Sequence, residues 1–560
     1  MPESKVARLR KRFTYLKQEY DSFIPHWVEL AQYFAPRRGR YLQGDSLSQH
    51  NDGSKKNSKI LNSDVLYFMH VMGAGLRYGI VPKSRPFFDV GLPDEDLAEY
   101  QPVREWLHKV RDAMLSIYSM ANYYGAQHHC FHEMPIFGMG AKVAIENDDT
   151  LVGYRPMTIG EYYLGTDAFG RPQDFFRRFS LSAGNIRDEF GDGEVSGLPN
   201  EVKSALAQGR EFQRFELVQA IEPWKEKENP KQYRYQSMYY MYAGSEDNAI
   251  LEEGGYHTRP FTVSRWAAVG SDTLTESPAM DMLGDNKQVQ CMESKSLLAL
   301  EKEIDPTLNA PENLRGIVTN MSSGVNYYNS QTGNGSEFVK PTHLVQLNLQ
   351  ALAVYIDRIV ERIKRGSYVE LFLPLQGENQ QMTAYEIAKR FEQPLVMLGP
   401  VFEGIQGDSL EPDFDRMFDI LVRNGMTPPA PMEIPPGMRL KVEFKSILLE
   451  ASRMVSATGM GQFVAFVGEV AKIQPEARHK MDGMELIDQF GASVSIPPKA
   501  IRSDDVAKKI AEQEAQASRM KQIAETAPQA TKAINDLATA SADGGETSVL
   551  QSLSQATKRQ

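Results

Sequence analysis

Cysteine is scarce in this chain of 560 residues, and so are long apolar runs. Its two cysteines, Cys130 and Cys291, cannot build a disulfide framework or a structural zinc cluster, which fits a reducing compartment. No uninterrupted apolar segment reaches the roughly 18 residues that indicate a membrane span. The first residues, from Met1 to Lys5, lack the apolar core of a signal peptide. The sequence therefore predicts a soluble intracellular product.

A positive net charge is also missing. The formal net charge is -11, which argues against tight wrapping of nucleic acid but allows a passage through which DNA slides without sticking. The chain has no GxxxxGK[ST] loop, and Phe137-Gly138-Met139-Gly140 precedes a predicted strand instead of a helix. Nothing therefore indicates an ATP-driven motor. At this length, with 41% hydrophobic residues, we expect two or more domains.

Candidate metal ligands occur together in the segment from Gln127 to Glu133. His128 and His132 are four residues apart and would share one face of a helix, as zinc ligands do. No Glu lies between them, as it would in the metalloprotease motif, and the spacing supplies no third ligand. We expect a structural helix here, with no metal and no cofactor. The alternative is a metallo-hydrolase that uses His128 and His132.

Apolar residues at helical spacing predict amphipathic helices over residues 4 to 34, 63 to 79, 103 to 117 and 277 to 302. Pro25 is expected to kink or split the first of these helices. The same helix carries four basic residues, Arg8, Arg10, Lys11 and Arg12. We interpret them as a solvated face in preference to a DNA contact, because no aromatic stacking pattern accompanies them.

Between residues 150 and 270 the pattern becomes that of β-strands. Segments 162 to 164 and 174 to 181 flank a turn-rich stretch and predict a hairpin. Further strands are expected at 215 to 221, 235 to 242 and 262 to 268, and short ones at 87 to 90, 142 to 145 and 440 to 444. A tyrosine stripe, formed by Tyr233, Tyr235, Tyr239, Tyr240 and Tyr242, favours sheet packing over base stacking, because only Arg234 is interleaved with it.

The stretch from residue 345 to 424 predicts two helices that position a polar loop. The first helix has one apolar stripe and ends in Arg362, Lys364 and Arg365 before Gly366. The loop, from Gln376 to Gln381, is polar throughout and holds no catalytic pairing. A capping box from Thr383 to Glu386 opens the second helix, which prolines and glycines are expected to kink.

Two segments differ in composition from the rest. Residues 305 to 343 are rich in Pro, Asn and Gly and lie between two predicted helices, so that the insert should project from the body. The last forty or so residues are rich in Ala, Gln, Ser and Thr, which predicts a weakly packed helix or a mobile tail.

Taken together, these stretches resemble the head-to-tail connecting (portal) proteins of short-tailed double-stranded-DNA bacteriophages. The likeness spans residues 5 to 510 and rests on the order and spacing of short motifs. These motifs include Trp27 with Pro36 to Gly39, Gly138 to Gly140 before a strand, Asp167 to Gly170, Ser277-Pro278, Thr383 to Arg390 and Gln474 to Glu476. Leu274-Thr275-Glu276 is a departure, since the family tends to have Tyr-Gly-Arg before Ser-Pro.

The resemblance implies an α+β, mainly α, portal fold that assembles as a ring, usually of about twelve copies. It assigns residues 1–276 to an α+β wing, 277–304 to a first stem helix, 305–343 to a clip, 344–366 to a second stem helix, 367–381 to a tunnel loop, 382–425 to a long kinked wing helix, 426–450 to a linker and return strand, and 451–560 to crown helices and a C-terminal tail.

The same resemblance implies a structural protein and not an enzyme. It would form the channel at one capsid vertex through which double-stranded DNA is packaged and later ejected. Its partners would be copies of itself, the large terminase subunit, tail adaptor or tail proteins, and the major capsid and scaffolding proteins, in a virion whose parts are made in the host cytoplasm. The alternative is a scaffold or tail structural protein that forms no ring.

Three sets of site residues follow from this assignment. The tunnel loop would present Gln376, Glu378, Asn379, Gln380 and Gln381 to DNA that passes without sequence preference, because uncharged amides suit a passage better than a reader of bases. A phosphate-facing belt would be formed by Arg362, Lys364 and Arg365. Alternatively, these three residues would form ion pairs with acidic residues of adjacent subunits. The clip would contact the motor and adaptor through Glu312, Asn313, Arg315, Asn320, Tyr327 and Tyr328.

Overall fold

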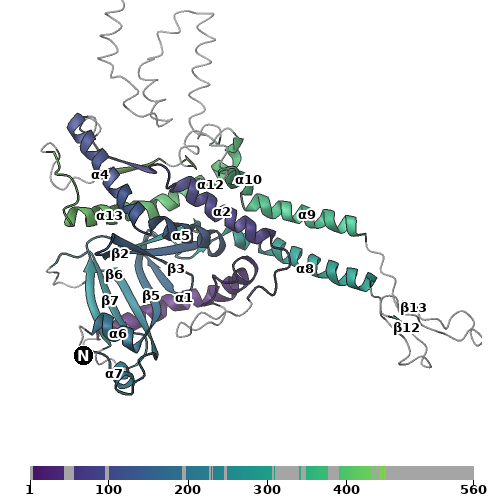
Figure 1. The fold of residues 1–560 in the computed structure, drawn as a ribbon, viewed down its shortest axis with the longest axis horizontal. Helices are drawn as coiled ribbons and strands as arrows, with labels where there is room; N and C mark the ends of the chain where they lie inside the picture. The colour runs from purple at the N-terminus through teal and green to yellow at the C-terminus, as the bar shows by residue number, and fades with distance from the viewer. Residues whose placement is uncertain are drawn as a thin grey trace, which may run out of the picture. The chain divides into compact units, whose positions relative to one another are not determined.

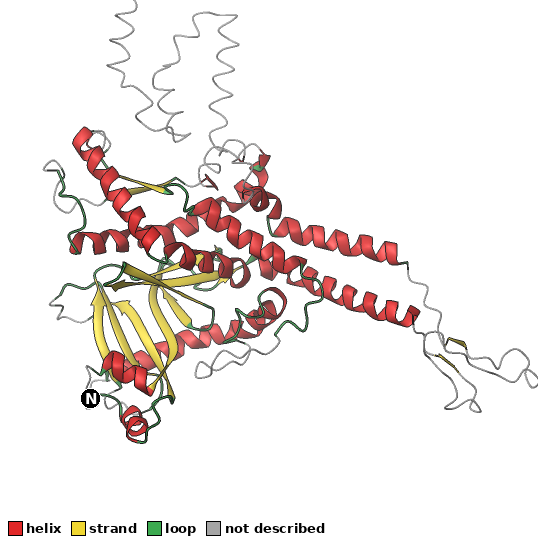
Figure 2. Cartoon of the chain, viewed as in Figure 1, coloured by secondary structure: helices red, strands yellow, loops and turns green. Residues whose placement is uncertain are grey.

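The chain divides into two compact units, Met1–Ser456 and Ala457–Gln560. The computed structural model describes residues of the first unit, shown in Figure 1. They are residues 4–42, 56–94, 97, 100–191, 197–225, 229, 231–244, 249–304, 308–309, 340–341, 348–375, 387, 390–431, 434, 440–445 and 447–448. The predicted crown helices and C-terminal tail therefore lie outside the described residues. Helices and sheets both contribute to the fold, which is α+β as expected (Figure 2).

The described part of the chain contains two larger antiparallel sheets. One has five strands in the order β4-β5-β6-β7-β8, and the other has three strands in the order β3-β2-β9. Their bounds are β2 (Met139–Asn147), β3 (Leu151–Met157), β4 (Tyr162–Thr166), β5 (Pro172–Ser182), β6 (Arg214–Pro223), β7 (Tyr235–Met241), β8 (Ile250–Tyr256) and β9 (Phe261–Arg265). The predicted hairpin and the strands near 142, 215, 235 and 262 are confirmed, whereas β3 and β8 were not predicted.

Three further antiparallel strand pairs are present among the described residues, and one of them joins segments that are far apart in the sequence. They are β1 (Phe88–Gly91) with β14 (Lys441–Phe444), β10 (Ala267–Ala268) with β11 (Thr275–Glu276), and β12 (Leu308–Asn309) with β13 (Lys340–Pro341). The first pair confirms the short strands expected near residues 87 and 440. The tyrosine stripe packs in β7 and its flanks as expected, with Tyr240 fully buried.

Helix α1 (Lys5–Phe34) begins at Ser4, whose Oγ accepts a hydrogen bond of 3.1 Å from the Ala7 backbone N–H. The helix continues through Pro25, so the expectation that this proline splits it is wrong. Pro25 has no backbone N–H, so the helix lacks one hydrogen bond there, and aromatic rings pack around this position. The Trp27 ring lies 5.4 Å from the Tyr20 ring and 5.6 Å from the Phe23 ring, measured between centroids. These contacts offset the loss of one hydrogen bond.

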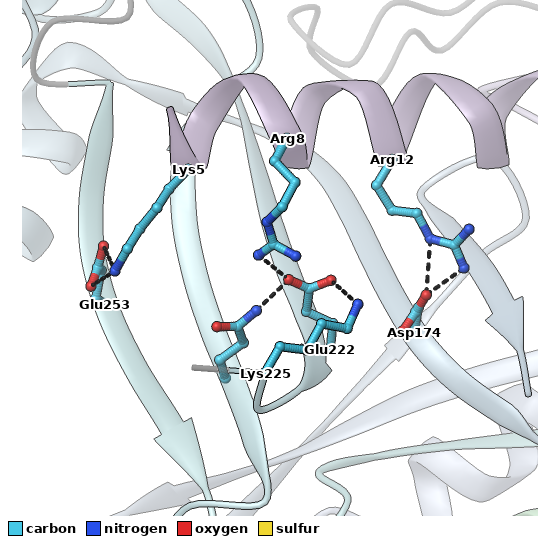
Figure 3. A network of polar contacts seen from close by, with 8 residues as sticks. Lys5, Arg8, Arg12, Asp174, Glu222, Lys225 and Glu253 are labelled. Carbon is cyan, nitrogen blue, oxygen red and sulfur yellow. Dashed lines mark hydrogen bonds and ion pairs between the residues drawn. The ribbon is translucent and has the colours of Figure 1, made fainter. Parts of the chain in front are cut away.

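The basic cluster of α1 holds the helix against the five-stranded sheet. Arg8 forms an ion pair with Glu222, whose side chain is almost fully buried, and Arg12 pairs with Asp174 at 2.5 Å (Figure 3). Arg10 donates to the backbone carbonyls of Met241 and Gly244. The interpretation as a solvated face is therefore wrong for these three residues, because acidic and carbonyl partners lie on strands far away in the sequence.

Most of the remaining helices were predicted. They are α2 (Asp64–Ile80), α4 (Gln101–Met120), α5 (Tyr123–Phe137), α6 (Ala183–Phe190), α7 (Asn200–Ala207), α8 (Pro278–Ile304), α9 (Leu349–Gly366), α10 (Val369–Leu375), α12 (Glu392–Ile405), the π-helical turn η2 (Gln406–Leu410) and α13 (Glu411–Arg423). The short helices α6, α7 and α10 were not predicted, and α10 occupies part of the segment 367–381 that was expected to be a loop. Among the described residues, no helix combines the length and the apolar character that a membrane crossing requires.

The glycines at the end of α5 have a structural role. Gly138 has a φ of 89° and ends the helix in a left-handed conformation, from which β2 starts. A Cβ at Gly140 would lie 2.7 Å from the Cα of Cys130, so a side chain there has no room. Close packing of α5 on β2 thus explains the Gly-x-Gly sequence, and no phosphate loop is present at this position.

The long interrupted helix is confirmed over its described part. Ile387, Phe391, Leu395, Leu398, Phe402 and Ile405 are all at most 8% exposed, as expected for one continuous apolar face. The interruption is η2, a π-helical turn that contains Gly407 and separates α12 from α13. Beyond it, Asp413 of α13 forms an ion pair with Lys142 at the centre of the three-stranded sheet.

Candidate functional site

Helices α8 and α9 pack side by side and form a two-helix arm (Figure 1). The buried residues of α8 all lie in its first half, up to Gln290, and those of α9 lie in its second half, at Ile359 and Ile363. The other halves expose large apolar side chains: Leu297 is 56% exposed, Ile304 76% and Val354 66%. Apolar exposure of this size on a projecting arm indicates a surface for another protein.

The insert between the two helices is closed at its base by a short strand pair. Leu308 of β12 lies opposite Pro341 of β13, and Asn309 lies opposite Lys340. This arrangement agrees with the predicted helix–insert–helix. The six predicted clip residues, Glu312, Asn313, Arg315, Asn320, Tyr327 and Tyr328, lie outside the described residues.

A tight turn follows α9 directly. The helix ends at Gly366 as predicted, and the Oγ of Ser367 donates a hydrogen bond of 2.5 Å to the Ile363 carbonyl. Tyr368 has a φ of 51°, an uncommon left-handed conformation for a residue with a side chain. Its backbone N–H donates to the Arg365 carbonyl at 3.1 Å. This turn fixes the start of α10 relative to the arm.

Helix α10 packs closely against α2 at Gly75, because this residue has no side chain. A Cβ at Gly75 would lie 2.6 Å from the Cγ of Phe372, whose own side chain is fully buried. The ring of Phe372 therefore occupies the space that any other residue at position 75 would fill. The predicted loop residues Gln376, Glu378, Asn379, Gln380 and Gln381 lie outside the described residues, but their attachment point, the end of α10, is set by this contact.

The candidate phosphate-facing belt lies at the inner end of α9. Arg362 forms an ion pair of 2.7 Å with Asp285 of α8, and Lys364 lies 3.4 Å from Glu361. Arg365 is exposed and has no carboxylate partner among the described residues. Surface ion pairs of this kind contribute at most about 1 kcal/mol to the stability of a protein, so such side chains can exchange partners.

The histidine cluster predicted on a helix is indeed part of α5. His132 is 4% exposed, and its Nε2 lies 2.6 Å from the Nδ1 of His70 on α2. Burial, and next the nearby Arg38, lower the pKa of His132 to about 3. Within the described ranges, no three His, Cys, Asp or Glu side chains are arranged to hold a metal ion. His128, whose ring centroid is 6.0 Å from that of His132, belongs to the same helix packing.

The buried His132 predicts a loss of stability in acid. Its folded pKa of about 3 lies below the ordinary 6.5, so its contribution is complete above pH 6.5 and is lost as the pH falls towards 3. In His132→Phe, the decline of the unfolding free energy between pH 6.5 and pH 4.5 should be smaller by about 1.4 kcal/mol per pH unit. Urea unfolding at both pH values measures it. Equal declines in both proteins would contradict a buried neutral imidazole.

The described residues thus form an α+β body from which the two-helix arm α8–α9 projects (Figure 1). Comparison with known proteins gives the family. A sequence profile described as "Bacteriophage head to tail connecting protein" matches residues 6–501. The chain therefore belongs to the bacteriophage head-to-tail connecting protein family, which confirms the resemblance. It is a structural component of the phage particle, at the junction of head and tail.

Individual relatives agree with this assignment. The chain is 32% identical over 499 residues to the "Probable portal protein" of Bordetella phage BPP-1, covering 88% of each chain. It is 29% identical over 549 residues to the "Portal protein" of Salmonella phage epsilon15, covering 96% of this chain and 97% of that one. A solved structure titled "Neck of empty GTA particle computed with C6 symmetry" also matches, over 78% of this chain and 90% of that chain. The TM-score is 0.35 and the sequence identity is 9%, so the similarity is too low to support a conclusion about this chain.

Proposed function

We propose that this chain is the subunit of a portal ring at one capsid vertex, through which double-stranded DNA is packaged and later ejected. The observation that carries the proposal is the α8–α9 arm, whose outer half has no core of its own and exposes Leu297, Ile304 and Val354. A projecting pair of helices with such side chains is stabilised when neighbouring copies cover them. Membership of the connecting-protein family supports the same role.

The ring would form by a head-to-tail contact repeated around an axis, with about twelve copies. A heterologous interface of this kind closes when the rotation between copies returns to the start. In this assembly, residues 1–276 and 382–450 would form the wing, the arm would form the stem, residues 305–343 the clip and residues 451–560 the crown. The wing would contact the major capsid and scaffolding proteins.

The channel would be lined by the loop that follows α10. Its amide side chains offer hydrogen bonds without fixed positive charge, and the net charge of -11 keeps DNA from binding tightly to the protein as a whole. In the ring, the copies of Arg362, Lys364 and Arg365 would together form one weakly positive belt around the channel. DNA could then slide in either direction without sequence preference.

Replacement of the loop residues by alanine is expected to impair packaging and not assembly. In a variant with Gln376, Glu378, Asn379, Gln380 and Gln381 all changed to Ala, rings should form in normal yield, because the described contacts that hold the fold lie elsewhere. Packaged DNA per particle should fall at least about tenfold. Quantitative PCR on nuclease-treated particles measures the loss. A normal yield of filled particles would contradict the role of the loop.

Deletion of residues 309–334 is expected to leave rings intact while abolishing motor and tail attachment. The deletion removes Asn309 from β12 but keeps Leu308 opposite Pro341, and the cost of loop closure changes slowly with loop length, so the arm should tolerate the shorter connection. The partners lost would be the large terminase subunit during packaging and the tail adaptor afterwards. Pull-down of purified rings with terminase, together with tail counts on particles, tests both. Particles that still package and carry tails would disprove the clip assignment.

A further inference from the structure

One side of helix α8 is covered by the body of the protein along its inner half. The Nδ2 of Asn286 donates a hydrogen bond of 3.0 Å to a backbone carbonyl of α1, and the Oε1 of Gln290 accepts one of 2.9 Å from the Asn62 backbone N–H. The side chain of Glu293 accepts another from the Asn62 amide at 3.3 Å. Asn286, Gln290 and Glu293 follow each other at steps of four and three, so they form one line along the helix.

The same line continues beyond the body as an exposed apolar stripe. Steps of four, three and four lead from Glu293 to Leu297, Leu300 and Ile304, all of which are exposed. Glu301, four residues after Leu297, is exposed as well and forms no ion pair among the described residues. Alternating steps of three and four are typical of helices that pack against another helix. We call Leu297, Leu300, Glu301 and Ile304 the acidic-apolar side of the arm.

Another side of the arm carries positive charge. The Nη2 of Arg362 on α9 lies 2.7 Å from the Oδ1 of Asp285 on α8, so these two residues mark one side of the helix pair. On α8, steps of three and four lead from Asp285 to Lys295 and Lys302, and on α9 Arg358 lies four residues before Arg362. Lys295, Lys302 and Arg358 are exposed, and no carboxylate pairs with them within the described part of the chain.

The two lines lie on nearly opposite sides of α8. Lys295 is two residues from Leu297, and Lys302 is two residues from both Leu300 and Ile304. Two residues span slightly more than half a turn of an α-helix, so such neighbours point away from one another. The cations and the acidic-apolar side of one copy therefore cannot cover each other.

Apolar surface lies beside the cations and could receive an apolar stripe. Val354 and Tyr355 are four and three residues before Arg358 and are 66% and 61% exposed. The methylene stems of Lys295 and Lys302 can also cover apolar side chains while their ammonium groups pair with carboxylates. We call these five residues the basic side of the arm.

We propose that the basic side of the arm binds the acidic-apolar side of the arm in a second copy of this chain. The two surfaces match in charge, both hold apolar side chains, and each chain carries one of each. Two like sides would instead bring charges of one sign together. A contact between unlike sides leaves one of each free, so copies add until a ring closes. The inference rests on the proposed ring and specifies which surfaces form its contacts.

Two variants each remove one side only. Lys295→Glu/Lys302→Glu/Arg358→Glu reverses the charge of the basic side, and Leu297→Asp/Ile304→Asp replaces the apolar stripe with negative charge. All five side chains are exposed, so both proteins should fold, with a Tm within a few degrees of that of the unchanged chain. In analytical ultracentrifugation of the full-length proteins, the unchanged chain should form closed rings, and each variant alone should remain a monomer.

Mixing the two variants in equal amounts tests which sides meet. The basic-side variant keeps its acidic-apolar side and the other variant keeps its basic side, so one copy of each should join. The two altered sides are both acidic and repel each other, so assembly should stop at a dimer. Rings from either variant alone, dimers from either variant alone, or no dimers in the mixture would overturn the proposal.

Lys287→Glu is the matched control, since it reverses an exposed lysine of the same helix whose partner, Glu29, belongs to the same chain. This variant should form rings, because Lys287 lies on the inner half of α8 and belongs to neither side. Loss of its rings would show that the two sides are not specific and would contradict the proposal. Rings from the basic-side variant that hold less packaged DNA would assign that side to DNA and refute the contact between copies.

Failure of the proposed function is seen separately, in the packaging of DNA. Rings of the unchanged chain that package no DNA in a complementation assay would contradict the channel and leave the contact between copies intact. Rings that form without either side would contradict the contact and leave the channel intact.

Discussion

Asp413→Ala is expected to destabilise the protein by about 3 to 5 kcal/mol, because it leaves Lys142 as an unpaired charge in the core. The two side chains are 1% and 2% exposed and form a direct ion pair. Lys142 also donates to Gln127, and Thr262 donates to Asp413 at 3.3 Å, so the pair belongs to a fully buried polar network. The pair anchors α13 to β2, and through η2 it fixes the end of α12.

Urea unfolding of the full-length protein measures this loss, and a second variant shows its cause. Lys142→Met/Asp413→Leu removes both charges and should recover most of the stability, because apolar side chains can replace a buried pair. Asp188→Ala breaks the exposed pair with Arg187 and should leave the urea midpoint nearly unchanged, because solvent screens exposed pairs. A loss in Asp413→Ala as small as that of Asp188→Ala would contradict the described network.

Gly75→Val is expected to displace α10 and to abolish phage production while leaving most of the fold intact. The new side chain would occupy the space of the Phe372 ring, and a clash with the inner atoms of a buried ring cannot be relieved by a change of rotamer. Overpacking of this kind costs about 1 to 3 kcal/mol, which a chain of this size can survive. Because α10 carries the loop, however, the loop would be moved at its root.

The measurement is phage yield by complementation together with the Tm of the purified protein. Yield should fall by about a hundredfold or more, with a Tm decrease of only a few degrees. Gly125→Ala is the control, since a Cβ at Gly125 of α5 would meet no atom within 4 Å. Normal yield from Gly75→Val would show that the position of α10 does not matter for function.

Elements with strong local patterns were predictable from the sequence. Helix α9 ends at Gly366 as expected because apolar spacing and a glycine stop coincide there. Strand β8 was missed because Glu252 to Gly255 gives little β propensity, and the tertiary pairing with β7 overrides it. Helices α6 and α7 have eight residues each, which is too short for a clear helical period.

The candidate site could be predicted only in part, because many of its contacts join residues that are far apart in the sequence. The sequence shows the basic residues of α1 but not their partners Glu222 and Asp174, which lie more than 160 residues away. Gly75 could have been suspected, since glycines at 73, 75 and 79 interrupt an otherwise strong helix. The loop and clip residues remain predictions.

Cryo-electron microscopy of the purified full-length protein tests the central claim most directly. We expect closed rings of about twelve copies around an axial bore, with the arms of neighbouring copies in contact through Leu297 and Val354. Residues 376–381 should line the bore. Particles without a bore, or rings in which that segment lies on the outer rim, would contradict the account.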